Sequence, residues 1–343
     1  QLGAIASEIT LCGGESATDY IGIQQIDDMT HYPENNVLRQ IWQFLYEGVN
    51  RANYMEENKA NIDFEGKEAM YGEVYFLRAY YYIELVKFFG DVPLFTEARL
   101  TAGQAGTLTR TPKDEVYAQI ELDLQNAIAS LPNSQSQVGR VNKYTAYALL
   151  GKVLLYQDKF AEAASALDNV IGVYSLVSDY GSQFLRFGEN GPESVFEIQY
   201  SNQSNWYDWG CAHCSEGNYA IIMNGPRGWS GPEYAQCWSF NVPTEEFYNS
   251  FEEGDSRRDA TVLDIEAFAA ATGASYTEGY DHTGYFNNKY IPRAGESGGQ
   301  TELNYLTNFR IIRYSDVLLM AAEAYNRGGI DDGLAQEFLN QVR

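Results

Sequence analysis

Apolar residues recur at helical spacing in one stretch after another of this 343-residue chain, and this repetition limits its fold more than any other feature. The stretches cover residues 37–57, 67–89, 112–131, 142–157 and 160–174, and a last pair begins near Ser315. Within the pair 142–157 and 160–174, Gly151 and Ala163 mark a close approach of two helices, as in tetratricopeptide repeats. Helix pairs of this kind bury their apolar faces only by stacking on their neighbours. The sequence therefore predicts a mainly α fold built on a tetratricopeptide-like scaffold of helical hairpins.

Turn-forming residues mark where several of these helices begin and end. Gly90 follows the helix predicted over 67–89, and Pro93 lies three residues beyond it, which is a typical stop signal. Thr111 is the expected N-cap of the next helix, with Pro112 at its first position. Turn-forming residues and the spacing of apolar residues therefore predict the same bounds for these helices.

The chain changes character along its length, which divides it into four segments. Residues 1–36 show little periodicity and are predicted to be an irregular N-terminal loop region, and the helical scaffold follows over 37–177. Residues 178–310 are rich in Gly, Asn, Ser and Pro, with one short strand expected from Ser194, and residues 311–343 begin the last helix pair. Long irregular segments are usually functional, so we expect 178–310 to be a loop-rich ligand-binding insertion.

Tryptophan is concentrated in this insertion. Four of the five tryptophans lie there, between Trp206 and Trp238. Aromatic rings with polar edges suit ligands that have apolar faces and hydroxyl edges, which describes sugars. A small core of the insertion itself would use the same rings, and the sequence leaves that alternative open. The candidate ligand-binding residues in this segment are Trp206, Tyr207, Trp209, Tyr219 and Trp229.

Charge disfavours two classes of partner. Lys and Arg total 23 and Asp and Glu total 47, which gives a formal net charge of −24. A field this negative repels phosphate backbones and anionic lipids, so neither nucleic-acid binding nor direct membrane binding is expected. No apolar run is long enough to span a bilayer. The chain lacks an initiator Met and stops within a helical pattern, so we expect segments beyond both ends.

Enzymatic motifs are absent or out of context. The match to G-x-S-x-G at 295–299 is not followed by a helical period, which a nucleophile elbow requires. Only three histidines are present, which leaves few candidates for a general base. The protein is therefore predicted not to be an enzyme. No cofactor is predicted either; the plentiful acids would allow a structural Ca²⁺ ion, but none is predicted.

The four cysteines allow two interpretations. Cys211 and Cys214 form a C-x-x-C motif, which together with Cys237 and either Cys12 or His213 would make a closed zinc site. A second C-x-x-C is missing, so disulfides or buried thiols are the favoured interpretation. No metal ligand is therefore predicted.

One block of sequence is more specific than the rest. Residues 72–94 contain G-E-V-Y-F-L-R-A-Y-Y-Y and then F-F-G-D-V-P-L. This block resembles the G-E-x-x-F-L-R-A-x-x-Y … F-G-D-V-P-L motif of the SusD/RagB family, the surface nutrient-binding lipoproteins of Bacteroidetes outer membranes. Further matches to this family, in its own order, lie at 42–53, 140–156, 243–258 and 312–324. The resemblance covers about 37–343.

The resemblance implies a tetratricopeptide-like scaffold with an irregular ligand-binding half. It also implies a surface-exposed location on the cell outer membrane, a lipid anchor on an N-terminal Cys missing from this sequence, and a SusC-like TonB-dependent transporter as partner. In starch-binding relatives the glycan lies against aromatic residues of an early loop and of the insertion. By that resemblance Tyr20, in the early loop, and the turn of Arg227 and Trp229 are candidate contacts. The early loop has no tryptophan, so another glycan or a peptide remains open as the ligand.

The function predicted from the sequence is the capture of an oligosaccharide or polysaccharide at the cell surface and its delivery to the transporter. Capture of oligopeptides by a RagB-like protein in the same type of complex is the first alternative, which the clustered tryptophans disfavour. A tetratricopeptide-like adaptor for protein partners and a glycan hydrolase are the others. Release of reducing ends from an oligosaccharide would distinguish the hydrolase from a binder.

Overall fold

The computed structural model describes residues 2–203, 216–297 and 303–343, which form two compact units. The loop-rich unit consists of residues 1–37, 177–191 and 198–309. The helical unit consists of residues 38–176, 192–197 and 310–343. Each unit is therefore assembled from segments that are distant in the sequence.

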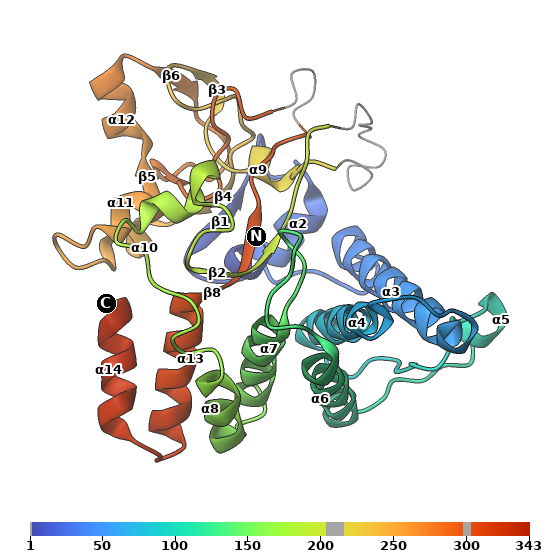
Figure 1. The fold of residues 1–343 in the computed structure, drawn as a ribbon. Helices are drawn as coiled ribbons and strands as arrows, with labels where there is room; N and C mark the ends of the chain where they lie inside the picture. Colours follow the sequence, from blue (N-terminus) through green and yellow to red (C-terminus); the bar gives the residue numbers. More distant parts are fainter. Residues whose placement is uncertain (1, 204–215, 298–302) are drawn as a thin grey trace. The chain divides into compact units, whose positions relative to one another are not determined.

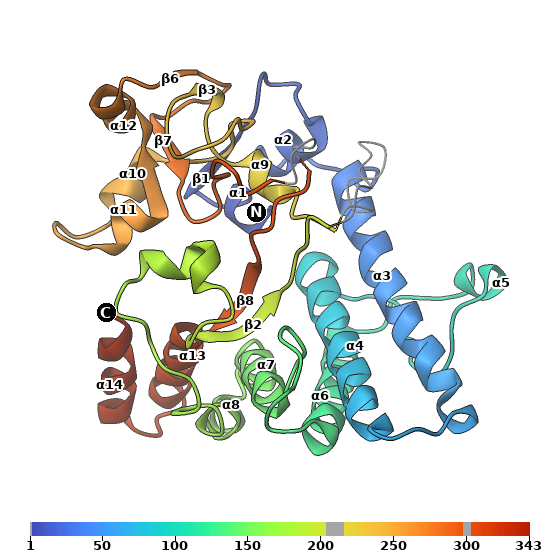
Figure 2. The same cartoon turned by 45° about the horizontal axis from the view of Figure 1, so that its top comes forward.

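Helices dominate the helical unit, so the predicted mainly α fold is confirmed. Helices α4, α6, α7, α8, α13 and α14 form a row in which each packs on the next (Figure 1, Figure 2). The bounds are α3 (Asn36–Glu57), η1 (Lys59–Asn61), α4 (Lys67–Phe89), α5 (Ala102–Ala105), α6 (Lys113–Ser130), α7 (Lys143–Leu155), α8 (Phe160–Asp168), α13 (Tyr314–Arg327) and α14 (Asp332–Val342), with paired strands β2 (Ser194–Ile198) and β8 (Phe309–Arg313).

Helix α4 contributes several large rings to the helical core. The rings of Tyr71, Phe76 and Tyr82 are fully buried. Arg78 of α4 forms a buried two-pronged ion pair with Asp123 of α6, at 2.8 Å from Nε and 2.7 Å from Nη2. Among the described residues no helix is both long and apolar enough to cross a membrane.

The pairing of α7 with α8 follows from a glycine. A Cβ atom at Gly151 would lie 2.5 Å from Cγ of Leu167, so only glycine allows this approach of the two helices. The close approach predicted there is confirmed. Helix α8 ends at Asp168 rather than near residue 174, because the chain turns at Asn169 and takes a positive φ of 81° at Gly172.

The start of α6 differs from the prediction. Thr111 is not the N-cap, because its backbone forms a β-bridge with Val92 and the helix begins after Pro112. The carboxylate of Asp91 instead accepts a hydrogen bond of 2.8 Å from the backbone N–H of Lys113. An acceptor from outside the helix thus replaces the local cap.

The loop-rich unit contains short elements joined by long connections. Its strands form two-stranded sheets, β1 with β4, β3 with β6 and β5 with β7, all antiparallel. The bounds are α1 (Leu2–Ile5), β1 (Thr10–Gly13), α2 (Ile21–Asp27), η2 (Gly181–Phe184), η3 (Arg186–Gly188), α9 (Ala220–Met223), β3 (Arg227–Ser230), β4 (Phe240–Pro243), α10 (Glu245–Asn249), α11 (Arg257–Thr261), β5 (Val262–Asp264), α12 (Ile265–Thr272), β6 (Ser275–Thr277) and β7 (Tyr285–Asn287).

Candidate ligand-binding site

The early loop is held in place by pairing with a strand more than 200 residues away. Strand β1 pairs with β4 so that Gly13 lies opposite Phe240. Gly13 has a φ of 73°, and a Cβ atom there would lie 2.1 Å from the backbone oxygen of Ser239. The amide of Gln24 donates a 2.6 Å hydrogen bond to the Gly13 carbonyl, which ties α2 to the strand. The turn between β1 and α2 is therefore fixed at both ends.

Tyr20 lies at the end of this turn in a strained conformation. It precedes α2 with a left-handed φ of 50°, which few residues other than glycine adopt. Its ring meets Phe240 edge to face, with 6.4 Å between the ring centroids. Backbone strain held by surrounding contacts often accompanies a functional position.

Arg227 fastens the same turn to β3. Its Nη2 lies 3.3 Å from Asp19 and donates a 2.9 Å hydrogen bond to the Trp238 carbonyl, and its Nη1 lies 3.7 Å from Glu15. The Nε–H of Arg227 is buried without a hydrogen-bond partner in the described part of the chain. The guanidinium thus positions the residue before Tyr20.

Three tyrosines gather beside this turn, and we call Tyr20, Tyr200 and Tyr219 the tyrosine cluster. Burial, followed by the nearby Tyr219, raises the pKa of Tyr20. Burial, again followed by Tyr219, raises the pKa of Tyr200 to about 12. The three phenols are therefore neutral at physiological pH, and their hydroxyls make no hydrogen bond to residues that the structure describes. Neutral hydroxyls both donate and accept, as the hydroxyls of an uncharged sugar require.

Acidic groups give this region a negative field. Burial and then the carboxylate of Asp27 raise the pKa of the buried Cys12 thiol to about 12. Burial, followed by Asp27 and Asp28, raises the pKa of Asp281. An anionic ligand would meet the same repulsion as these carboxylates do.

The prediction that Trp229 contacts a ligand is corrected by its burial. Trp229 is 9% exposed, and its ring centroid lies 5.8 Å from Tyr234 and 5.9 Å from Phe268. Its indole N–H is buried without a partner among the described residues. Trp229 belongs to the small core of the loop-rich unit, which is the alternative that the sequence left open. Trp238 is half-buried against Ile222.

Several other predictions fall outside the described residues. Trp206, Tyr207 and Trp209 lie there, so their contact with a ligand stays a prediction. The C-x-x-C motif at Cys211 lies there too. Cys12 and Cys237 are free and buried. In the parts of the chain that are described, no group of three His, Cys, Asp or Glu side chains could hold a metal ion.

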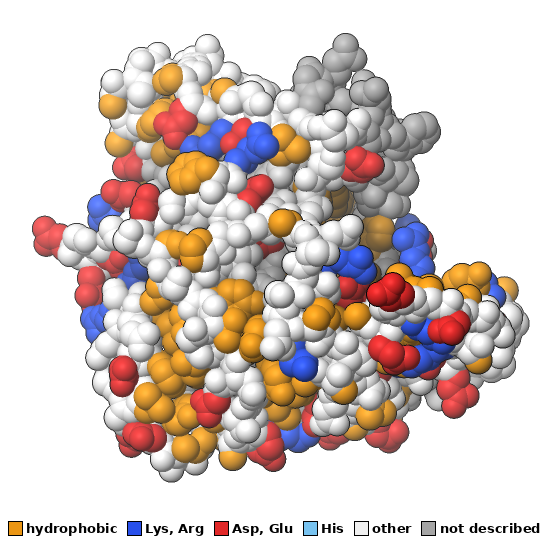
Figure 3. Space-filling view, in the orientation of Figure 1, with side chains coloured by type: hydrophobic (Ala, Val, Ile, Leu, Met, Phe, Trp, Pro, Cys, Tyr) orange, Lys and Arg blue, Asp and Glu red, His pale blue; other side chains and the backbone are white. Residues whose placement is uncertain are grey.

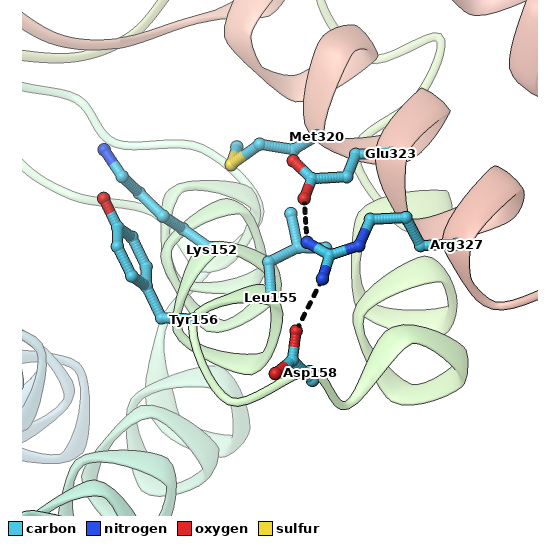
Figure 4. A pocket seen from close by; sticks show the side chains of 7 residues that line it. All are labelled: Lys152, Leu155, Tyr156, Asp158, Met320, Glu323 and Arg327. Carbon is cyan, nitrogen blue, oxygen red and sulfur yellow. Dashed lines mark hydrogen bonds and ion pairs between the residues drawn. The ribbon is translucent and has the colours of Figure 1, made fainter.

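Two hollows stand out in the helical unit. The first, about 460 Å³, lies between α7 and α13. Figure 4 shows Arg327 reaching between two acids on one side of it, with hydrogen bonds of 2.6 Å to Glu323 and 2.9 Å to Asp158. Lys152 and Tyr156 extend from α7 on the other side (Figure 4). The second hollow, about 470 Å³, is bounded by α3 and the arm that carries α5.

Comparison with known families matches nearly the whole chain. A family model described as "Starch-binding associating with outer membrane" matches residues 13–155, and the SusD family model matches residues 192–343. SusD-like protein P2 of Formosa agariphila is 30% identical over 93% of this chain. The chain spans 65% of the length of that relative.

Solved structures resemble the chain as a whole. A laminarin-binding SusD-like protein is 36% identical, with a TM-score of 0.91 over 100% of this chain and 77% of that one. Surface glycan-binding protein A from Bacteroides thetaiotaomicron, solved in complex with laminarihexaose, is 28% identical. Its TM-score is 0.89 over 99% of this chain and 75% of that protein.

Proposed function

This chain belongs to the SusD family, and from that premise we propose that it is a surface glycan-binding protein that holds an uncharged oligosaccharide at the tyrosine cluster. The observation that carries the proposal is the group of three neutral phenols, none of which bonds to a described residue. Rings and hydroxyls at one place match the apolar faces and polar edges of sugar rings. Contact of Trp206, Tyr207 and Trp209 with the glycan stays a prediction, since these residues lie outside the described part of the chain.

A neutral glucan of the laminarin type is the proposed ligand. One solved relative is named for laminarin binding, and another holds laminarihexaose. The carboxylates of Asp19 and Glu15 flank the cluster, and the chain carries a net charge of −24. Both features repel sulfated or carboxylated polysaccharides, so they support an uncharged ligand.

The proposed mechanism is capture without chemistry. The protein would be lipid-anchored at the outer membrane surface and would pass the glycan to a SusC-like TonB-dependent transporter, with which it forms a complex. Because both partners are held at one membrane, the effective concentration of glycan at the transporter is high even when binding is weak. Dissociation constants between about 1 mM and 1 μM, or about −4 to −8 kcal/mol, would suffice.

Calorimetric titration with laminarihexaose tests this proposal. We expect wild-type protein to bind, and Tyr20→Ala and Tyr219→Ala each to weaken binding by about 1–2 kcal/mol, as removal of an interface anchor does. Tyr32→Ala is the matched control, because Tyr32 is a 52% exposed tyrosine of the same unit outside the cluster, and it should bind like wild type. Failure of wild type to bind any uncharged glycan, or binding of oligopeptides instead, would contradict the proposal.

Delivery to a transporter needs a separate experiment. The full-length protein, tagged and isolated from outer membranes in mild detergent, should co-purify with a SusC-like β-barrel protein. Tyr20→Ala should co-purify equally well, because the tyrosine cluster is proposed to contact glycan rather than transporter. Recovery of the tagged protein without any such barrel would reject the proposed partner.

A further inference from the structure

The second hollow of the helical unit has an aromatic floor. Trp42 and Tyr46 lie one helical turn apart on α3, with 4.8 Å between their ring centroids. Tyr46 stacks on Phe95 at 5.6 Å with only 12° between the ring planes, and its hydroxyl donates to the Pro93 carbonyl at 2.7 Å. These contacts hold the floor rigid. Leu100, Ala102, Ala105 and Leu108 of the arm line the opposite side.

Two residues that line this hollow carry hydrogen-bond donors without a partner in the described part of the chain. The Oδ1 atom of Asn50 accepts a 3.1 Å hydrogen bond from the backbone N–H of Leu100, which fixes the orientation of the amide. Its NH₂ group and the indole N–H of Trp42 donate to no residue that the structure describes. Neither nitrogen is among the fully buried side-chain atoms that lack a partner in the described residues, so neither is completely enclosed by them.

The residues that line the hollow carry no charge, although 20% of the chain is charged. The first hollow differs, because four of its seven lining residues are Lys152, Asp158, Glu323 and Arg327. Figure 3 shows acidic and basic side chains interspersed with hydrophobic ones over the region of α3 and α5. A docking site for an apolar protein segment would instead be expected to continue into an exposed apolar patch.

An uncharged, aromatic-floored hollow with free N–H donors suits a ligand with apolar faces and oxygen acceptors. Its volume of about 470 Å³ falls within the usual range for small-molecule sites. We propose that this hollow is a second carbohydrate site, which binds an uncharged sugar unit independently of the tyrosine cluster. The inference rests on the proposed function in one respect, namely that the ligand is a glycan. Two sites on one protein increase its retention on a polymer, because a second contact forms at a high effective concentration.

Four proteins test this inference by calorimetry with laminarihexaose and by mobility in gels that contain laminarin. They are wild type, Ala105→Trp to fill the hollow, the cluster variant Tyr20→Ala/Tyr219→Ala to remove the tyrosine cluster, and the triple variant that combines all three substitutions. Ala105→Trp should weaken retention on laminarin about three- to tenfold, the loss expected for one or two hydrogen bonds. The cluster variant should keep residual binding, which the triple variant should lose. Ala105→Ser is the matched control, and thermal melting checks the fold.

The outcomes separate this inference from the proposed function. Two results together would overturn the second site and leave the tyrosine cluster unaffected. Ala105→Trp would bind laminarin as tightly as wild type does, and the triple variant would bind it as tightly as the cluster variant does. Unchanged binding by the cluster variant, with loss in Ala105→Trp, would support the hollow and contradict the cluster. Trp42→Phe keeps a ring but removes the N–H, so it should weaken laminarin retention without unfolding the protein. Loss of transporter co-purification in Ala105→Trp, with glycan binding unchanged, would identify a protein-docking site and overturn the proposal.

Discussion

The two units differ in the surroundings of their tyrosines and in backbone geometry. In the helical unit, the rings of Tyr71, Phe76 and Tyr82 are fully buried. In the loop-rich unit, the hydroxyls of the tyrosine cluster lack partners among the described residues. Of the eight described non-glycine residues with positive φ, seven lie in the loop-rich unit, namely Tyr20, Met29, Asn190, Glu233, Ser239, Asn241 and Asp281.

This difference has consequences for how substitutions in each unit change stability and binding. Helix propensity and burial favour the native state of the helical unit, so core substitutions there should change the free energy of unfolding. Each left-handed residue of the loop-rich unit costs of order 1–3 kcal/mol, and surrounding contacts must hold it. Substitutions that release such contacts should therefore change ligand binding as well as stability.

Arg78→Met is expected to have the largest effect. It leaves the carboxylate of Asp123 buried between α4 and α6 without its counter-ion, since both side chains are at most 5% exposed. Breaking a buried pair from one side typically costs about 3–5 kcal/mol. Chemical denaturation followed by circular dichroism measures the loss, and Arg78→Met/Asp123→Leu should recover most of it. A loss below about 1 kcal/mol would mean that the pair is solvated and weak.

Gly13→Ala should lower both the stability and the glycan binding of the loop-rich unit. The new Cβ would clash with the Ser239 backbone oxygen at a positive φ, which should loosen β1 from β4 and release Tyr20. We expect a loss of about 2–4 kcal/mol in stability, together with weaker glycan binding. Gly66→Ala isolates the conformational cost, because Gly66 also has a positive φ of 83° but no atom within 4 Å of its Cβ position. Equal losses in the two variants would show that the clash with Ser239 is relieved without cost.

Lys152→Met should have the smallest effect, and the size of that effect depends on pH. Burial, followed by the charge of Lys87, lowers the pKa of Lys152 in the folded protein. The folded state therefore binds this proton less tightly than the unfolded state does. The resulting loss of folding stability is full below the folded pKa and disappears as pH rises past the unfolded pKa. At neutral pH the variant should melt about 1–2 °C higher than wild type. The difference should shrink at alkaline pH in calorimetric scans, and a difference that grows would contradict the burial argument.

The helical unit could be predicted from sequence because its signals are local. The period of α4 and the stop at Gly90 gave its observed bounds, Lys67–Phe89. The site was less predictable, because Tyr20 and Tyr219 are brought together by pairing between distant strands. Trp229 misled the prediction for the same reason, since Phe268 of α12 covers its ring. Tyr200 carried no signal beyond being one aromatic residue among many.

Hydroxyl-radical footprinting with and without laminarihexaose tests the central claim most directly. The protein is expected to lose modification at Tyr20 and Tyr219 when the oligosaccharide binds, while Tyr32 and Tyr156 are modified equally in both states. Binding of the oligosaccharide with Tyr20 and Tyr219 modified as in the free protein would contradict the claim that the tyrosine cluster is where this protein holds its glycan.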